Sequence, residues 1–527
     1  MPDREACLRA VRSRESRFDG VFFTAVRTTG IYCRPSCPAV TPKDANMTFY
    51  PSAAAAVAAG YRACRRCRPD ASPGSPEWDV RGDVVARAMR LVRDGVVDRE
   101  GVPGLAGRLG YSARQLERLM LAELGAGPAA LARAQRAYTA RLLIESTGLP
   151  LGDVAFAAGF SSIRAFNEAV AQVYATTPTE LRARSVKASA SCASARPQRW
   201  AMGAEGPGRR VGASGLAPGS PAVEAGAGAM VVRLRLPRRD PFVADNLFGH
   251  LAATAVPGIE EWRDGAYRTT LRLPVAAGLA ALTPRSGCVA AELMLADPRD
   301  LAPAIARCRA LLDLDADPEA IGAVLGADPA LGRPWRDAPG RRVPRSVDAG
   351  EFALRAVLGQ QISVARAANL TARLVTELGD PIVDPRGGLS RLFPSFERLA
   401  DLNPAELPMP RARGRAFVGL AQHLADGSLD LSPGCDRDRA RARLAELPGI
   451  GPWTVEVIAL RGLGDPDAFP GSDLGVRKGL EHLGLDPSAA EQWRPWRAYA
   501  VQYLWASDAQ HAINRLPGSG PGNQEAS

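Results

Sequence analysis

Lysine and long apolar runs are nearly absent from this chain of 527 residues. Of its 66 basic residues only Lys43, Lys187 and Lys478 are lysines, so a mechanism that requires a lysine nucleophile has very few candidates. No run of about 18 or more apolar residues occurs, which excludes a transmembrane helix and a membrane partner. The net charge of +10 favours a polyanionic partner such as nucleic acid.

Cysteine is scarce as well, with nine residues in the chain, but four of them form two close pairs. Cys33 and Cys37 make the first pair, and Cys64 and Cys67 make the second. Two such pairs complete a tetrahedral four-thiolate site for one Zn²⁺, and no histidine lies near them. The alternatives are two disulfides or reduced thiols without a role. The charged first residues lack an apolar signal segment, so we expect a cytoplasmic protein and a metal site rather than disulfides.

Composition and apolar periodicity divide the chain into six segments. We expect a zinc domain, a helical domain, a flexible linker rich in Ala, Ser, Gly and Pro, a small antiparallel α/β domain, an all-α domain and a disordered tail, at residues 1–73, 78–184, 185–229, 230–315, 316–510 and 511–527. Alternating apolar residues predict strands at 230–236, 267–273 and 287–295. The predicted fold class is therefore multidomain, mainly α with α+β parts, and the zinc domain is a small α/β unit.

Two helix-turn-helix units follow the cysteines. Residues 105–119 and 154–169 each contain a short helix, a glycine turn and a second helix, and Ser112 with Gln115 forms a capping box that starts the second helix of the first unit. In such units the second helix enters the major groove of DNA, while Leu116, Leu119, Phe160 and Phe166 pack inside. The residues that we expect to face DNA are Arg114, Arg118, Ser161, Ser162, Arg164 and Asn167.

A glycine-rich hairpin lies further along, at residues 447–454. Gly449 and Gly451 let backbone N–H groups approach a phosphate closely, and the helix that begins near Thr454 favours an anion. We expect these three residues to contact DNA. The turn alone is only moderately specific.

The cysteine region, with residues 22–37, 46–50 and 58–70, closely resembles the N-terminal domain of the Ada alkylation-response family. This resemblance implies that Cys33 accepts a methyl group irreversibly from a DNA methylphosphotriester, with the other three cysteines as zinc ligands. Methylation turns a thiolate into a thioether, so the site becomes less negative and its DNA affinity should rise, as in an electrostatic switch. Arg34 is a candidate phosphate contact beside it. A purely structural zinc is the competing interpretation.

The two helix-turn-helix units, which end in Thr-Pro-Thr-Glu-Leu-Arg, resemble the AraC/XylS-type regulator domain over residues 80–184. The resemblance implies sequence-specific binding to promoter DNA and transcription activation, with RNA polymerase as a partner.

The hairpin and residues 459–474 resemble the helix-hairpin-helix DNA glycosylases, and residues 230–510 are most similar to the AlkA-type 3-methyladenine DNA glycosylase II. The resemblance implies Asp473 as the catalytic carboxylate, Trp453 and Trp505 as walls of the base pocket, and Gln361 as the wedge that fills the vacated stack. Trp453 occupies the position of the lysine nucleophile of bifunctional relatives, so a monofunctional enzyme is expected. A monovalent cation at the hairpin is a further candidate cofactor.

These resemblances predict a DNA alkylation repair and response protein of bacterial, nucleoid-associated type. It would hydrolyse the N-glycosidic bond of alkylated purines of the 3-methyladenine and 7-methylguanine type, and it would accept a methyl group on Cys33 to activate transcription. We expect a monomer that binds double-stranded DNA, both alkylated and promoter DNA. The alternative is a transcription regulator with a structural zinc and a catalytically inactive C-terminal DNA-binding domain.

Overall fold

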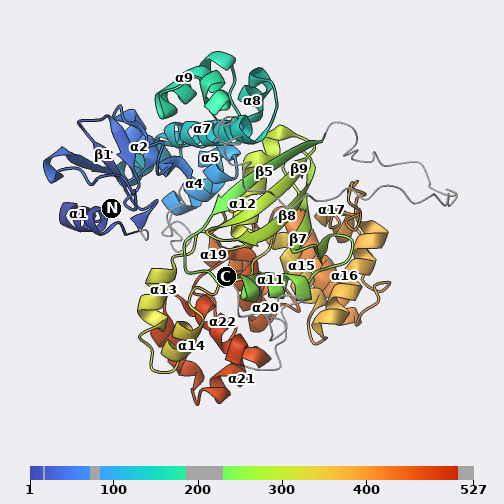
Figure 1. The fold of residues 1–527 in the computed structure, drawn as a ribbon. Coiled ribbons are helices and arrows are strands. Elements are labelled where there is room, and N and C mark those ends of the chain that lie inside the picture. The colour runs from blue at the N-terminus through green and yellow to red at the C-terminus, as the bar shows by residue number, and fades with distance from the viewer. Residues whose placement is uncertain (16–17, 72–83, 185–228, 508–527) are drawn as a thin grey trace.

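The structure is a computed structural model that describes residues 1–15, 18–71, 84–184 and 229–507 (Figure 1). The expected tail at 511–527 and the expected linker at 185–229, apart from residue 229, lie outside these ranges. Within them, no helix has both the length and the apolar character needed to cross a membrane. We refer to residues 1–184 as the N-terminal half and to residues 229–507 as the C-terminal half.

A four-stranded sheet brings the two cysteine pairs together. Its strands are β1 (Phe23–Val26), β2 (Ile31–Cys33), β3 (Met47–Tyr50) and β4 (Arg62–Ala63), in the order β3-β1-β2-β4. Strands β2 and β4 are parallel neighbours, so Cys33 at the end of β2 lies beside Cys64, which follows β4. Helices α1 (Arg4–Ser13) and α2 (Ala53–Ala58) complete this domain.

The rest of the N-terminal half is helical. Its helices are α4 (Val84–Arg93), α5 (Val96–Leu109), α6 (Ala113–Leu124), α7 (Pro128–Ser146), α8 (Leu151–Ala157), α9 (Ile163–Tyr174) and a last helix at 178–184. The predicted capping box is confirmed, because the Ser112 side chain accepts from the Gln115 N–H and the Gln115 side chain caps in return. Ser162 caps α9 in the same way, by accepting from Ala165 N. Leu116 and Phe166 are fully buried, as expected.

A five-stranded antiparallel sheet opens the C-terminal half. Its strands are β5 (Met230–Pro237), β6 (Glu260–Arg263), β7 (Ala266–Arg272), β8 (Ala277–Arg285) and β9 (Cys288–Leu295), in the order β5-β9-β8-β7-β6. Helices α11 (Ala244–Ala253) and α12 (Leu301–Leu311) accompany it. The three predicted strands correspond to β5, β7 and β9. Strands β6 and β8 were not predicted, because β6 is short and the first four residues of β8 are all buried.

The remaining helices form two cores. They are α13 (Pro318–Leu325), α14 (Gly332–Asp337), α15 (Ala349–Leu358), α16 (Val364–Leu378), α17 (Phe396–Ala400), α18 (Arg411–Ala425), α19 (Arg437–Glu446), α20 (Pro452–Val457), the π-helical turn Ile458–Leu463, α21 (Leu474–His482) and α22 (Arg497–Ser507). Buried residues from 316–343 pack in one core with buried residues from 459–504. Trp493 and Trp496 are buried in this core.

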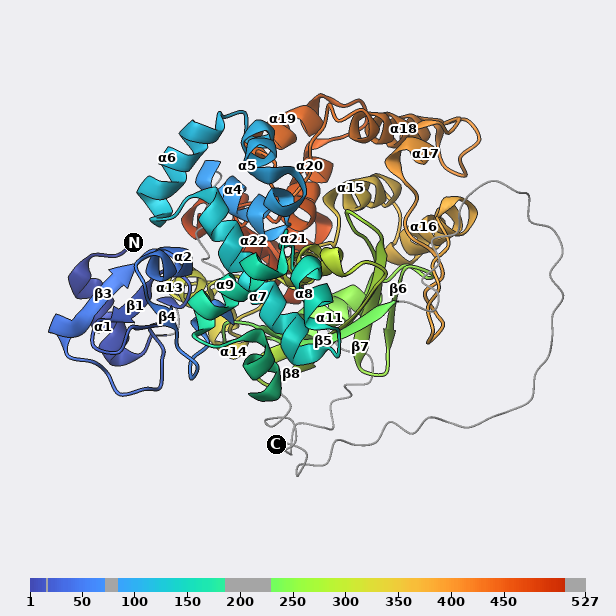
Figure 2. The ribbon, with the colours of Figure 1, turned by 90° about the horizontal axis from the view of Figure 1, so that it is seen from above.

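The two halves are docked against each other. Tyr32 of the zinc domain, Val170 of α9 and Val232 of β5 belong to one continuous cluster of buried side chains. In Figure 2, α4 lies beside the start of α19, where Arg87 Nε donates to Gly434 O at 3.0 Å. The described parts of the chain therefore form one body rather than separate modules.

Close packing of α21 against α22 generates a first prediction. A Cβ atom at Gly479 of α21 would lie 2.5 Å from the carbonyl oxygen of Leu504 in α22. We expect Gly479→Ala to lower the free energy of unfolding by about 1–3 kcal/mol, as overpacking does. Chemical denaturation followed by tryptophan fluorescence measures this change.

The matched control is Gly419→Ala in α18, where a Cβ atom would meet nothing within 4 Å. Alanine favours a helix over glycine by up to about 1 kcal/mol, so this variant should be neutral or more stable. Equal destabilisation by both substitutions would show that the α21–α22 contact is not close-packed.

Candidate active site and metal centre

Asp473 is the N-cap residue of α21, and four N–H donors fix its carboxylate. Oδ1 accepts from the backbone N–H groups of Gly475 (3.0 Å) and Val476 (3.1 Å), as expected for an aspartate at this position. The indole of Trp505 also donates to Oδ1 (3.0 Å), and that of Trp453 donates to Oδ2 (3.1 Å). An ionised carboxylate is a pure acceptor and can accept all four bonds at once.

The two tryptophans reach Asp473 from distant segments of the chain. Trp453 lies in the first turn of α20, directly after the hairpin, and Trp505 lies in α22. Both side chains are partly exposed. The structure thus brings together the three residues proposed for base excision. Their hydrogen bonds were not foreseen, because the sequence analysis treated the tryptophans only as aromatic walls.

His250 of α11 also belongs to this site, and sequence reasoning missed it. Its ring is stacked on that of Trp505, with centroids 6.2 Å apart and an interplanar angle of 16°. No sequence motif connects α11 with the C-terminal helix, so only the fold shows the contact.

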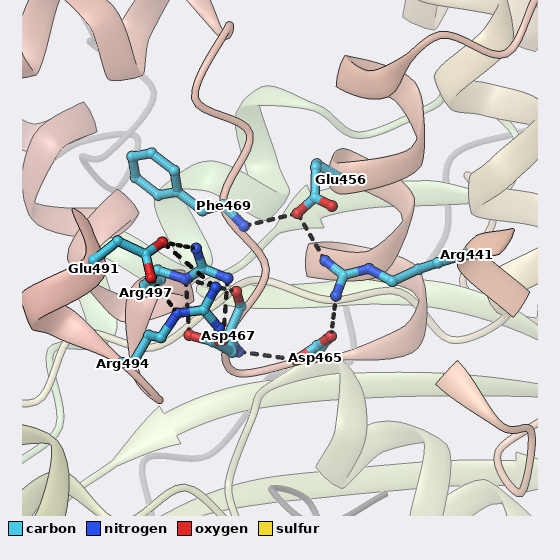
Figure 3. A network of polar contacts seen from close by, with 8 residues as sticks. All are labelled: Arg441, Glu456, Asp465, Asp467, Phe469, Glu491, Arg494 and Arg497. Carbon is cyan, nitrogen blue, oxygen red and sulfur yellow. Dashed lines mark hydrogen bonds and ion pairs between the residues drawn. The ribbon is translucent and has the colours of Figure 1, made fainter. Parts of the chain in front are cut away.

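The loop before Asp473 is held by ion pairs (Figure 3). Arg441 of α19 contacts Asp465 at 2.8 Å and Glu456 at 2.7 Å, and Glu456 accepts from the backbone N–H of Phe469 at 2.9 Å. These contacts connect α19 and α20 to the loop that leads to Asp473.

Asp467 anchors the same loop from the opposite side. Its carboxylate contacts Arg497 at 2.8 Å and also Arg494, and both arginines contact Glu491. Asp465 and Asp467 are loop residues that bond to arginines, and in the described part of the chain neither forms a hydrogen bond with Trp453 or Trp505. Their role is therefore to position the loop.

The hairpin is braced by Gln360, which was not predicted. Gln360 Nε2 donates to Gly449 O and to Thr454 Oγ1, both at 3.0 Å. Gly449 has a φ of 86°, in the region that favours glycine, and Gly451 is exposed. The Thr454 side chain is only 2% exposed and points into the protein. The DNA contact of Thr454 stays a prediction, and it would be made by the backbone N–H and not by this buried side chain.

Gln361 lies in the turn between α15 and α16, next to Gln360. It is exposed and has a φ of 57°, a conformation that non-glycine residues rarely adopt. The turn thus places an exposed side chain beside the hairpin, in keeping with the proposed wedge.

The four cysteines form one cluster in which all sulfur atoms lie within 4.8 Å of one another. Four sulfurs about 2.3 Å from a zinc ion lie about 3.8 Å apart in a tetrahedron, so the cluster fits Zn²⁺. The described cysteines are all free thiols, so the disulfide alternative finds no support. Cys33 and Cys37 are both half-buried, and exposure alone does not distinguish them.

Asp19 holds the loop between Cys33 and Cys37. Its carboxylate, which is almost fully buried, accepts from Ser36 N (3.1 Å) and Ser36 Oγ (2.6 Å), and it contacts Arg34 Nη1 at 3.3 Å. Burial raises the pKa of Asp19, against these hydrogen bonds and the Arg34 charge. Arg34 was expected to face phosphate, but it is already paired with Asp19. A DNA contact by Arg34 would therefore compete with this ion pair.

Two further arginines beside the cluster also contact protein. Arg65 donates to the carbonyl of Ala175, after α9, at 3.2 Å, and Arg68 contacts Glu145 of α7 at 2.5 Å. The basic rim of the zinc domain thus joins it to the helix-turn-helix domain.

The six residues expected to face promoter DNA are all exposed, and they lie at or near the starts of α6 and α9. Arg164 contacts Glu168 at 2.9 Å, but both side chains are exposed and such pairs contribute little. These residues are Arg114, Arg118, Ser161, Ser162, Arg164 and Asn167.

The ion pairs of the loop generate a second prediction. We expect Arg441→Ala to release Asp465 and Glu456 and to accelerate hydrogen exchange of the loop amides at 464–473 by about tenfold or more, because local opening becomes easier. Arg443→Ala is the control, since Arg443 lies in the same helix and pairs with exposed Glu446. Unchanged loop exchange in Arg441→Ala would contradict the positioning role.

Four family models match the chain. They are the metal binding domain of Ada at residues 6–70, a helix-turn-helix domain at 105–184, the AlkA N-terminal domain at 233–348 and the HhH-GPD superfamily base excision DNA repair protein at 354–493. These matches confirm the expected multidomain fold class and support Zn²⁺ as the metal of the cysteine cluster.

Comparison with curated proteins agrees with this arrangement. The chain is 34% identical over 273 residues to DNA-3-methyladenine glycosylase 2 of Escherichia coli, which covers 50% of this chain and 93% of the relative. It is 40% identical over 138 residues to the bifunctional transcriptional activator/DNA repair enzyme Ada of Escherichia coli, covering 26% and 36%. It is 55% identical over 521 residues to the probable bifunctional transcriptional activator/DNA repair enzyme AlkA of Mycobacterium tuberculosis, covering 98% of both chains. The chain therefore belongs to the family of bifunctional transcriptional activator/DNA repair enzymes that this mycobacterial AlkA protein represents.

Proposed function

We propose that the C-terminal half is a monofunctional DNA-3-methyladenine glycosylase, which hydrolyses the N-glycosidic bond of 3-methyladenine and 7-methylguanine type lesions in double-stranded DNA. One observation carries this proposal: the Asp473 carboxylate is held by four N–H donors between Trp453 and Trp505. Gln361 would fill the vacated stack, and Gly449, Gly451 and the Thr454 backbone would contact the DNA phosphates.

The chemistry follows from the charges. The damaged nucleotide leaves the duplex stack, and its positively charged base is attracted to the indole faces. The bond between C1′ and the base nitrogen breaks, and its electron pair neutralises the departing base. Positive charge develops on the sugar, where a fixed carboxylate stabilises it. Water then bonds to C1′ and releases its proton to solvent.

The residue at position 453 restricts the reaction to base removal. Trp453 stands where bifunctional relatives have a lysine, so no Schiff base with the sugar and no strand cleavage are expected. We also propose that a monovalent cation binds at the hairpin. The carbonyl of Gly449 already accepts from Gln360, so a cation at this carbonyl would have to share it.

The N-terminal half is proposed to accept a methyl group on Cys33. Bound zinc would keep the four sulfurs as thiolates at neutral pH. Cys33 Sγ attacks the methyl carbon of a methylphosphotriester, the carbon–oxygen bond breaks, and the DNA phosphate leaves with the electron pair. The resulting thioether carries no charge, so repulsion from DNA falls and affinity rises.

The exposed faces of α6 and α9 support promoter binding by the methylated protein. In this proposal the protein acts as a monomer in the cytoplasm and recruits RNA polymerase to the promoter. The competing function is a regulator with a structural zinc and an inactive C-terminal domain, and the two experiments below separate them.

Asp473→Asn tests the glycosylase. The variant keeps the shape but loses the charge, and its amide N–H₂ group would meet an indole donor. We expect the single-turnover release of 3-methyladenine from methylated DNA to fall by at least about a hundredfold. The control is Asp486→Asn, another aspartate that caps a helix, by accepting from Ser488 N. Release by Asp473→Asn at the wild-type rate would show that the catalytic assignment is wrong.

Peptide mass spectrometry tests the methyl acceptor. After incubation with DNA that carries methylphosphotriesters, we expect one added methyl group on Cys33 and none on the other three cysteines of the cluster. Removal of the metal with a chelator should slow this transfer strongly, because thiols are weaker nucleophiles than thiolates. Methylation of Cys37 instead would move the role to the second half-buried cysteine.

A further inference from the structure

We propose that the C-terminal half is a physical part of the methyl-acceptor site: Arg239 holds Asp19, and Asp19 holds the Cys33–Cys37 loop. The functional consequence rests on the proposed methyl transfer to Cys33. The structural link does not, because it concerns the geometry of the cysteine cluster itself.

Asp19 forms the first link. Only 3% of this residue is exposed. Its carboxylate accepts hydrogen bonds from the Ser36 N–H and the Ser36 hydroxyl and forms an ion pair with Arg34. Arg34 and Ser36 lie between the two half-buried cysteines of the cluster. A displacement of Asp19 therefore displaces the loop that carries Cys33.

Arg239 forms the second link, from the opposite half of the chain. It lies between β5 and α11 and is 6% exposed. Its Nη2 donates to the backbone carbonyl of Asp19 at 2.5 Å, and its Nη1 donates to the backbone carbonyl of Asp315 at 2.9 Å. The planar guanidinium fork thus bridges two carbonyls, which a lysine amine cannot reproduce.

Asp315 anchors this bridge. Its carboxylate contacts Arg309 of α12 at 2.5 Å and Arg93 of α4 at 3.3 Å. Burial alone would raise the pKa of Asp315, but these arginines hold it below its ordinary range. The zinc domain, the helix-turn-helix domain and the C-terminal half therefore meet at the pair Arg239 and Asp315.

The link has a consequence for reactivity. Methyl transfer requires the Cys33 sulfur to align with the carbon–oxygen bond that breaks, and small misplacements of reacting atoms cost large factors in rate. Arg239 is buried and bonds to the backbone carbonyls of Asp19 and Asp315, so it would act as a positioning residue. If the contact only packs the halves together, its loss leaves the cysteine cluster unchanged.

The test uses the full chain with Arg239→Ala. We expect zinc transfer to a chromogenic chelator to become several-fold faster and the absorption bands of the Co²⁺-substituted cluster to change. Single-turnover methyl transfer at saturating DNA should fall by about tenfold, with half-saturation by DNA unchanged. Arg239→Lys should recover part of each effect. The control is Arg233→Ala on β5, where the arginine is exposed and pairs with Glu292.

The outcomes separate the two proposals. Wild-type zinc transfer and a wild-type cobalt spectrum in Arg239→Ala would overturn the link. The wild-type protein could fail to methylate Cys33 while Arg239→Ala still changes zinc transfer and the cobalt spectrum. That result would support the link and refute the methyl-acceptor function. Base release in the same samples reports whether the C-terminal half is folded. If Arg239→Ala loses base release, the zinc-transfer and cobalt-spectrum measurements are made on Arg239→Lys, which keeps the buried charge. A wild-type cluster in Arg239→Lys would then overturn the link.

Discussion

The hydrogen bonding of the Asp473 carboxylate is the constraint on which the C-terminal half depends. Its four donors come from the first turn of α21, from the helix after the hairpin and from the last described helix. They converge only if α21 packs closely on α22, as Gly479 allows, and if ion pairs hold the loop at 464–472. A catalytic carboxylate fixed before DNA binds needs little reorganisation in the transition state.

A second buried aspartate plays the corresponding part in the N-terminal half. Asp19 does not touch the sulfurs, but it fixes the loop that carries two of them. Its support comes partly from Arg239, more than two hundred residues further along the chain. The shared core and the contacts of Asp315 join the two halves, so the zinc domain, the helix-turn-helix domain and the C-terminal half pack against one another.

The sequence predicted those features that depend on interactions within a short segment of the chain. The cysteine pairs and the Ser112 cap were found from the sequence, because each depends on spacing within a short segment. Asp473 came from the resemblance to a glycosylase family, and its catalytic role stays a prediction. Contacts between distant segments could not be found in this way. The stacking of His250 on Trp505, the pairing of Arg34 with Asp19 and the burial of the Thr454 side chain all depend on tertiary packing. Strand β8 was missed because its first four residues are all buried, so it lacks the alternation that identifies a half-buried strand.

The central claim is that two separate chemistries, one at Asp473 and one at the cysteine cluster, share one chain. The most direct test measures free 3-methyladenine and methylated Cys33 in the same reaction, on DNA that carries both lesions. The account predicts that Asp473→Asn loses base release and keeps methylation, whereas Cys33→Ser loses methylation and keeps base release. Undiminished base release in Asp473→Asn, or methyl transfer to the cluster in Cys33→Ser, would contradict it.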